Sequence, residues 1–284
     1  MSTRYVLMNF GTSEARLLQA HYCLLSLLAK RDPADEIVLV TDVPESFAWL
    51  KGEIRIHPLS AEQLRAWIGP SGYFFRTLIQ CIILATELEP VPDVAVYLDT
   101  DTIVLGDPAR LWADVDRGAV AMDCREYNLS SSRRRGNRAL WKEVGDRTFA
   151  GFTVTPAINM WNTGITALGR AHYPLARRAL AVNDAMLESG CRHFLTEQIA
   201  LSTVLESSAP MVEVNPAGEA PLIVHYWGNK DGYGHAIHEQ LSSILIRKLA
   251  PMDAAAYIAS RPISLPTRIR RTWWQRLLRV KPAT

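Results

Sequence analysis

Two aspartates separated by one residue interrupt an apolar segment of the chain. The segment Val96–Val104 reads Val-Tyr-Leu-Asp-Thr-Asp-Thr-Ile-Val, and Asp99 and Asp101 stand where apolar residues would otherwise continue a buried strand. Carboxylates are costly to place near a core unless they are paired, bound to a metal or located at a strand end. If the chain turns here, both carboxylates point to one side and form a hard-oxygen site for a divalent cation. The alternative is a polar strand end with capping aspartates.

The segments before this pair alternate between patterns typical of strands and of helices. Strands are predicted over residues 5–10, 37–41 and 53–57, and helices from a turn and cap at 11–13 through 28 and over 73–87. This order predicts an α/β fold with an open, mostly parallel sheet flanked by helices, in which ligands bind at the carboxyl ends of strands. Asp99 and Asp101 end the next predicted strand, so they would lie at that edge.

The composition is that of an ordinary globular protein. The 284 residues are 48% hydrophobic and 21% charged, which suits one large domain or two small ones. The four cysteines follow no metal-ligand spacing, which disfavours a zinc knuckle or a disulfide framework. No uncharged apolar run reaches the roughly 18 residues that span a bilayer, and no secretory leader follows Met1. We therefore expect neither an integral membrane protein nor an exported precursor.

Residues 261–284 form a basic tail that differs from the rest of the chain. The net charge of +2 divides into +7 for this tail, which has no acid, and therefore −5 for residues 1–260. As a helix, the tail would place Ile269, Trp273 and Leu277 on one face among arginines, as helices at membrane surfaces do. We expect it to contact an anionic membrane; the alternative is a helix docked on its own domain. Nucleic acid is not expected as a partner, because the acidic body would repel it.

The aspartate pair belongs to a longer motif. From Tyr97-Leu98-Asp99-Thr100-Asp101 through Gly106-Asp107 to Leu111-Trp112, the sequence resembles the metal-site region of retaining glycosyltransferases of family 8. This family includes lipopolysaccharide galactosyltransferases and glycogenins. The resemblance spans about residues 5 to 235 and implies a GT-A-type catalytic domain over residues 1–260.

Two further motifs of this family are matched in the expected order. The stretch Tyr73–Leu78 is similar to a helix start whose arginine, here Arg76, reaches the donor sugar. The stretch Ile158–Ile165 is similar to a strand that ends in Asn-small-Gly, here Asn162 and Gly164, which would approach the sugar closely. Asn-x-Gly is also common turn chemistry, which is the alternative interpretation.

A third motif carries the expected catalytic residues. The stretch Phe194–Leu201 resembles an acidic-Gln helix start, in which the glutamine, here Gln198, lies beneath the anomeric carbon, with Glu197 before it. An acid in the first turn of a helix has a purely structural alternative explanation. At the end of the first predicted strand, the resemblance also assigns Asn9 to donor binding.

The last motif is Ile223-Val224-His225-Tyr226-Trp227-Gly228-Asn229-Lys230. A lone histidine after an apolar strand is more often structural than a ligand. The resemblance implies, however, that His225 is the third protein ligand of the metal, and that Gly228 and Lys230 contact the donor. Lys230 follows His225 by five residues, whereas the family's lysine usually follows by six and precedes Pro-Trp.

Together these residues predict a metal-dependent enzyme. Asp99, Asp101 and His225 would form a mixed oxygen and nitrogen site that suits Mn²⁺ and tolerates Mg²⁺. The resemblance implies a UDP-sugar donor, a saccharide or lipid-linked saccharide acceptor of the lipopolysaccharide type, and retention of anomeric configuration. Since no carboxylate stands out as a nucleophile, we expect front-face attack by the acceptor hydroxyl, with Gln198 supporting the sugar. The expected location is the cytoplasm, peripherally on the inner face of the membrane.

Two alternatives belong to other functional classes. Asp-x-Asp also occurs in haloacid dehalogenase-like phosphatases, but there it closes the first strand and is followed by an acidic pair that this chain lacks. The second alternative is a non-catalytic, membrane-associated scaffold, which would leave Asp99, Asp101 and His225 unexplained. Glycine-rich segments at 68–73 and 228–234 are predicted to be lids over the donor. The basic run 132–138 is predicted to be either a solvated loop or a phosphate contact on an anionic acceptor.

Overall fold

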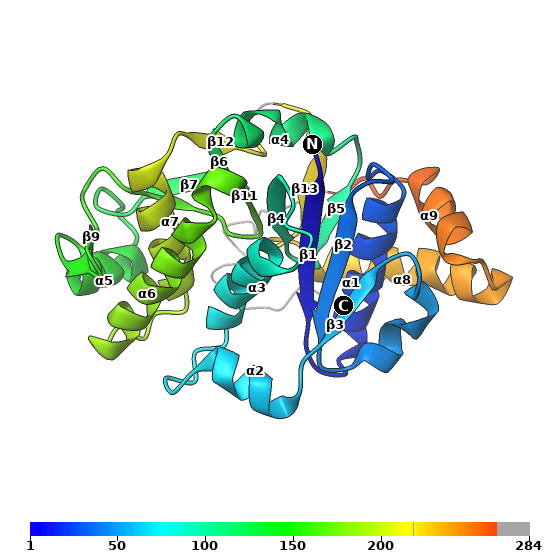
Figure 1. The fold of residues 1–284 in the computed structure, drawn as a ribbon, viewed down its shortest axis with the longest axis horizontal. Coiled ribbons are helices and arrows are strands. Elements are labelled where there is room, and N and C mark those ends of the chain that lie inside the picture. The colour runs from blue at the N-terminus through cyan, green and yellow to red at the C-terminus, as the bar shows by residue number, and fades with distance from the viewer. Residues whose placement is uncertain (218, 266–284) are drawn as a thin grey trace, which may run out of the picture.

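A twisted, mixed sheet runs through the centre of the protein, whose structure is a computed structural model that describes residues 1–217 and 219–265. Within this part, seven strands pair in the order β12-β6-β11-β4-β1-β2-β3 (Figure 1). They are β1 Thr3–Asn9, β2 Glu36–Thr41, β3 Arg55–Pro58, β4 Val94–Leu98, β6 Val120–Met122, β11 Ile165–Gly169 and β12 Met211–Glu213. Short two-stranded sheets are formed by β5 Thr102–Val104 with β13 Ile223–His225, β7 Arg125–Asn128 with β10 Asn159–Trp161, and β8 Thr148–Phe149 with β9 Phe152–Thr153.

The sheet is mostly parallel, as the alternating sequence pattern predicts. Strand β1 pairs in parallel with β2 and β4, β2 with β3, and β12 with β6, whereas β11 runs antiparallel to both of its neighbours. Strands β1, β4 and β6 therefore end at the same edge. The residues at or just after these ends are Asn9, Asp99 and Asp123, so polar side chains from three strands are brought to one place.

Helices cover both faces of the sheet, and this explains why its central strands are almost uniformly apolar. Side chains alternate between faces along a strand. Accordingly, Tyr5 and Leu7 of β1 pack in one hydrophobic cluster, and Val6 between them packs in the other. The first cluster includes buried residues of α1 Glu14–Leu28, α4 Ala109–Asp116, α8 Lys230–Arg247 and α9 Pro251–Ala259. The second includes those of α3 Arg76–Glu87, α5 Arg135–Val144, α6 Pro174–Glu188 and α7 Thr196–Ser208. The remaining helices are α2 Ala61–Ile68 and the 3₁₀ turns η1 Pro44–Leu50 and η2 Arg170–His172.

The first two predicted strands and the first helix are confirmed within one or two residues, but the predicted lids differ in form. The segment 69–75 is a series of turns between α2 and α3, whereas the second expected lid is largely helical, because α8 begins at Lys230. The reason is that Tyr233 is fully buried, with its ring stacked on Tyr226 at 4.7 Å and edge-on to Tyr22 at 6.3 Å. These ring contacts hold the first turn of α8 against α1 and the end of β13.

The predicted amphipathic tail helix lies outside the described residues, apart from 261–265. None of the helices in the described part is long and apolar enough to cross a bilayer.

Candidate metal centre and adjoining cavities

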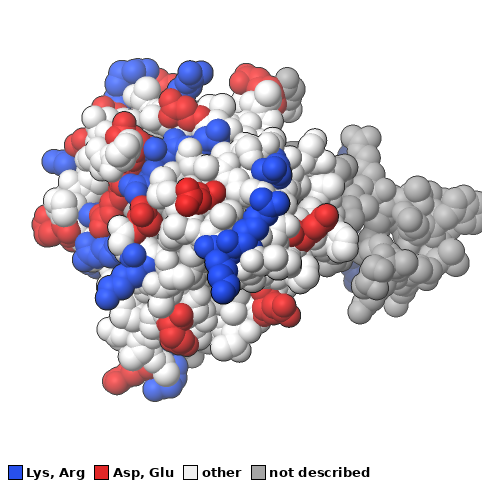
Figure 2. Space-filling view, turned by 90° about the vertical axis from the view of Figure 1, so that its right-hand side faces the viewer, with Lys and Arg blue, Asp and Glu red and all other residues white. Residues whose placement is uncertain are grey.

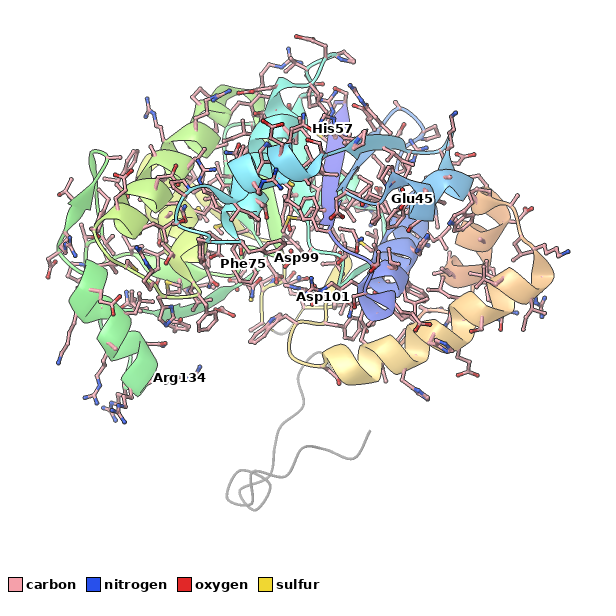
Figure 3. The ribbon with its side chains drawn as sticks, turned by 90° about the horizontal axis from the view of Figure 1, so that it is seen from below. Glu45, His57, Phe75, Asp99, Asp101 and Arg134 are labelled. Atoms are coloured by element: carbon pink, nitrogen blue, oxygen red, sulfur yellow. The ribbon has the colours of Figure 1, made fainter. Side chains whose placement is uncertain are left out.

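Three side chains from two segments that lie far apart in the sequence meet at the carboxyl edge of the sheet. Nε2 of His225 lies 3.2 Å from Oδ1 of Asp101 and 3.6 Å from Oδ2 of Asp99. One ligand atom from each residue falls within a group whose members lie within 4.8 Å of one another. Figure 3 shows Asp99 and Asp101 next to each other near the middle of the molecule. The structure therefore brings together the three residues that the sequence predicts to be metal ligands.

Strand pairing explains how His225 reaches the aspartates. The chain turns at Asp99 and Asp101 and resumes as β5, which pairs antiparallel with β13 so that Thr102 lies opposite His225. The backbone N–H of Tyr226 also donates to the carbonyl of Asp101, at 2.9 Å. This register places the histidine beside the residue that precedes β5, more than a hundred positions away in the sequence.

Gly164 makes room for the imidazole. This residue precedes β11, and its carbonyl accepts a 2.7 Å hydrogen bond from the N–H of Asp99, so its backbone adjoins the cluster. A Cβ at this position would lie only 2.0 Å from Cε1 of His225. The sequence predicts that Gly164 allows close approach of the sugar. In the structure, the imidazole of His225 fills the space that a side chain at position 164 would occupy.

Asp123, which the sequence analysis missed, holds the other side of the imidazole. Nδ1 of His225 donates to Oδ2 of Asp123 at 2.7 Å, and the second carboxylate oxygen of Asp123 accepts from Asn215 at 2.6 Å. All three His225 contacts involve side chains that are at least two-thirds buried. A carboxylate on Nδ1 fixes the tautomer that leaves Nε2 available to a cation, as is usual for metal-binding histidines. Asp123 directly follows β6 and could have been found by the same strand-end reasoning as Asp99.

The carboxylates around His225 also determine its charge. Burial by itself lowers the pKa of His225, but the hydrogen bonds and the attraction from Asp101 and Asp123 outweigh it and raise the pKa to about 10. Without a metal the imidazole therefore carries a proton that neutralises part of the acidic cluster. A divalent cation would have to displace this proton, because a histidine ligand must be neutral.

Among the described residues, two cavities adjoin the cluster, and Asp99 lines both. The larger, of about 490 Å³, is lined by residues that include Glu126, Asn162, Glu197, Gln198 and His225. The smaller, of about 250 Å³, is lined by Asn9, Phe10, Arg16, Gln19 and the aspartate pair, among others. The carboxylate pair thus stands between two hollows rather than at the end of one.

Glu126 joins two predicted site residues in the larger cavity. Its Oε1 accepts from the amide of Asn162 at 3.2 Å, and its Oε2 accepts from the amide of Gln198 at 3.0 Å. The N–H of Gly164 donates to the side-chain oxygen of Asn162 at 2.9 Å, which connects this network to the metal cluster. Glu126 was also missed by the sequence analysis, because nothing in the local pattern of β7 distinguishes it from a surface acid.

Glu197 points into the same cavity but has a separate partner. It accepts a hydrogen bond from the hydroxyl of Tyr73, which also lies 2.9 Å from the carbonyl of Phe194. Burial raises the pKa of Glu197 to about 7, with a smaller contribution from the negative charge of Asp99, while the Tyr73 hydrogen bond partly offsets the shift. Glu197 is therefore a carboxyl group that changes charge near neutral pH.

The remaining predicted donor residues differ in how they relate to the cavities. Asn9 is buried beside the smaller cavity, and its amide nitrogen has no hydrogen-bond partner among the described residues. Gly228 lies in the short connection between β13 and α8, and Lys230 is the first residue of α8. Arg76 departs from the prediction: it lines neither of these two cavities and forms a two-point ion pair with Asp184 at 2.8 and 2.9 Å.

Comparison with known proteins relates this fold to two enzymes. The chain is similar to apo mouse xyloside xylosyltransferase 1, with a TM-score of 0.52 and 12% identity over 76% of this chain and 85% of that one. It is also similar to the galactosyltransferase LgtC, solved with donor and acceptor sugar analogues, with a TM-score of 0.53 and 12% identity over 83% of this chain and 95% of that one. No family model matches the sequence, and no curated protein matches it. The predicted GT-A-type α/β fold is thereby confirmed at the level of structure.

Proposed function

We propose that this protein is a metal-dependent, retaining glycosyltransferase of the family 8 type, which transfers a hexose from a UDP-sugar to a hydroxyl of a saccharide or lipid-linked saccharide. The observation that carries the proposal is the cluster of Asp99, Asp101 and His225 between two cavities at the carboxyl edge of the sheet. Similar folds occur in a xylosyltransferase and a galactosyltransferase.

The residues of the cluster fit a divalent cation. Two carboxylates and one imidazole nitrogen are a donor set that suits Mn²⁺ and accepts Mg²⁺. Asp123 holds Nδ1 of His225, so Nε2 faces the aspartates, and Gly164 leaves the space that this ring orientation needs. When bound, the cation would stabilise the negative charge on a departing nucleoside diphosphate.

The smaller cavity is the place proposed for the nucleotide. Arg16 contributes a positive charge there, and the unpartnered amide nitrogen of Asn9 is a buried donor that needs an acceptor. An unsatisfied buried donor costs about 1–3 kcal/mol, so a nucleotide oxygen that accepts this hydrogen bond would bind favourably. Since Asp99 lines both cavities, the diphosphate would lie at their junction, beside the cation.

The larger cavity is the place proposed for the transferred sugar and the acceptor. The amide nitrogen of Gln198 donates to Glu126, so the amide oxygen of Gln198 is the atom left to support positive charge on the sugar ring. Both oxygens of Glu126 accept hydrogen bonds, which makes it a positioning group rather than a nucleophile. Glu197 is tied to Tyr73 and changes charge only near pH 7. This arrangement favours front-face attack by the acceptor hydroxyl, with the leaving phosphate taking its proton.

The two alternative functions are less well supported. In a haloacid dehalogenase-like phosphatase the aspartate pair would follow the first strand, whereas here it follows β4. An inert scaffold would have no reason to keep Asp123 and Gly164 arranged around His225.

The proposal is tested by Mn²⁺-dependent release of UDP from a panel of UDP-hexoses without acceptor. We expect hydrolysis of at least one of them, lost on adding a chelator and reduced at least about 100-fold in Asp101→Asn. Asp107→Asn is the matched control, because Asp107 is an exposed aspartate of the same segment. Absence of UDP release from every UDP-hexose, or release that does not depend on metal, would contradict the proposal.

We also propose that the protein acts peripherally at an anionic membrane, on its cytoplasmic face. Besides the basic tail, the last turn of α8 exposes Leu245 and Ile246 next to Arg247 and Lys248, and the first turn of α9 exposes Met252. Figure 2, which views the side of the molecule that carries α8 and α9, shows a band of Lys and Arg side chains. Apolar and basic side chains together suit an anionic lipid surface. A variant that lacks residues 266–284 and carries Ile246→Asp should no longer sediment with phosphatidylglycerol vesicles, but it should still release UDP. Sedimentation that persists in this variant would contradict the proposed membrane location.

A further inference from the structure

The larger cavity is lined by groups of both charges. Its wall includes Asp99, Glu126 and Glu197, and also Ser132 and Arg134, which precede α5, and Asn137 of α5. Figure 3 shows Asp99 near the centre of the molecule and Arg134 further out, where α5 begins. A ligand that fills this cavity would therefore meet both carboxylates and a guanidinium.

The loop that carries the basic group is held in place by its own hydrogen bonds. The side-chain oxygen of Asn128 accepts from the hydroxyls of Ser130 and Ser131, at 2.8 and 3.0 Å, and its amide donates to the carbonyl of Pro156 at 2.9 Å. Further along, the amide of Asn137 donates to the hydroxyl oxygen of Ser132 at 2.8 Å. Because this oxygen accepts, the hydroxyl hydrogen of Ser132 remains available to a ligand in the cavity.

Within the part of the chain that the structure describes, the arginines of this segment have no carboxylate partners. Among the described residues, Arg133, Arg134, Arg135 and Arg138 form no ion pair, although arginines elsewhere pair with acids, as Arg76 does with Asp184. Arg134 belongs to the cavity wall: burial and the negative charge of Glu126 raise the pKa of Tyr127, another wall residue, and the positive charge of Arg134 partly offsets this rise. Four unpaired guanidinium groups within six residues attract anions and bind phosphate in a two-point geometry.

Exposed aromatic rings also line the cavity. Phe75, Phe194 and Trp227 are 42%, 65% and 37% exposed, and all three belong to the cavity wall. Exposed apolar groups of this size around a cavity indicate a ligand with apolar faces, which the C–H faces of a sugar ring provide.

We propose that the acceptor is a phosphorylated saccharide: Arg134 and Ser132 hold its phosphate, the aromatic rings contact its sugar ring, and its reacting hydroxyl lies near Gln198. This role as acceptor rests on the glycosyltransferase activity proposed above. The anion site itself rests on the cavity, on Arg134 in its wall and on the neighbouring arginines, which form no ion pair among the described residues.

The test compares binding of galactose and galactose 6-phosphate by calorimetry, with a chelator present so that no phosphate binds through a cation. We expect the phosphorylated sugar to bind at least about tenfold more tightly, which corresponds to about 1.4 kcal/mol. Arg134→Gln should reduce this preference to about twofold, and Arg134→Lys should retain part of it. Arg178→Gln, which removes an exposed arginine of α6 outside the cavity wall, is the matched control and should change nothing.

Equal binding of the two sugars, or a preference that persists in Arg134→Gln, overturns the inference even if metal-dependent UDP release is observed. If the preference is present and depends on Arg134 but no UDP-hexose is hydrolysed, the anion site stands and the proposed activity fails. The preference should also weaken between about 50 and 500 mM salt, since an exposed ion pair is screened at the shorter Debye length.

Discussion

Replacing Gly164 with alanine tests the metal cluster without touching any proposed ligand. A Cβ at this position would lie 2.0 Å from Cε1 of His225, and 2.5 and 2.8 Å from its two ring nitrogens. Ordinary contact begins at 3.4 Å, so the imidazole or the backbone of residue 164 must move by about 1.4 Å, the difference between 3.4 and 2.0 Å. The backbone conformation of Gly164 is accessible to alanine, because its φ is not positive. The predicted effect is therefore entirely steric.

A shift of this size removes His225 from the coordination geometry. Metal–ligand distances tolerate deviations of only about 0.2 Å, so Nε2 can no longer bind together with Asp99 and Asp101. Mutating a residue that holds a metal ligand in place typically weakens metal binding by about 10–100-fold. Displacing the ligand residue itself should reach the upper end of this range. We expect Mn²⁺ affinity to fall about 100-fold and stability to fall by about 1–3 kcal/mol from overpacking.

The assay is calorimetric titration with Mn²⁺, accompanied by thermal unfolding. Gly234→Ala is the control, because it makes the same chemical change in α8, where the added Cβ has no neighbour within 4 Å. In a His225→Ala background the clash is gone, so Gly164→Ala should then cost almost nothing in stability. If Gly164→Ala binds Mn²⁺ within about threefold of the unmodified protein, the steric reasoning is refuted.

Three further predictions concern the surrounding carboxyl groups. Asp123→Asn removes the negative charge that holds Nδ1 of His225, so calorimetry should show Mn²⁺ affinity reduced about 10–100-fold and NMR titration should show a lower pKa for His225. Glu126→Gln leaves one oxygen for two amide donors, so transfer should fall about 10–100-fold while Mn²⁺ affinity stays within about threefold. The folded protein holds the Glu197 proton more tightly than the unfolded chain does. The contribution of Glu197 to the protein's folding stability is therefore lost as pH rises from 4.5 to about 7. Chemical denaturation should therefore find Glu197→Gln at least as stable as the unmodified protein above pH 7, and without that advantage below pH 4.5.

The three proposed metal ligands could be singled out in the sequence because each carries a local signal. Asp99 and Asp101 interrupt an apolar run, and His225 ends another, so sequence position alone places them at strand ends. What brings them into contact is the antiparallel register of β5 and β13, which no local pattern encodes. The resemblance to a known motif order supplied this long-range information.

The position of Asp123 after a strand follows from the same strand-end reasoning, but its role and that of Glu126 could not be predicted, because both roles depend on strand pairing. Asp123 reaches His225 because β6 lies beside β11, and Glu126 reaches Asn162 and Gln198 because β7 pairs with β10 next to α7. In the sequence, the two acids lie in a short polar segment without a helical or alternating period. Their importance is created by tertiary structure, which joins three separate segments around one cavity.

The different partners of Arg76 and Tyr73 show how the loop 69–75 shapes both cavities. Arg76 donates to the carbonyl of Trp67 at 2.6 Å, and a partly buried two-point ion pair with Asp184 on α6 holds it away from both cavities. Three residues earlier, Tyr73 is tied to Glu197 on α7. The two residues between these anchors are Phe74 and Phe75; Phe75 lines both cavities and Phe74 the smaller one. Because the loop is attached on both sides of this aromatic pair, a change in either anchor should alter the walls of both cavities, the proposed donor and acceptor sites, together.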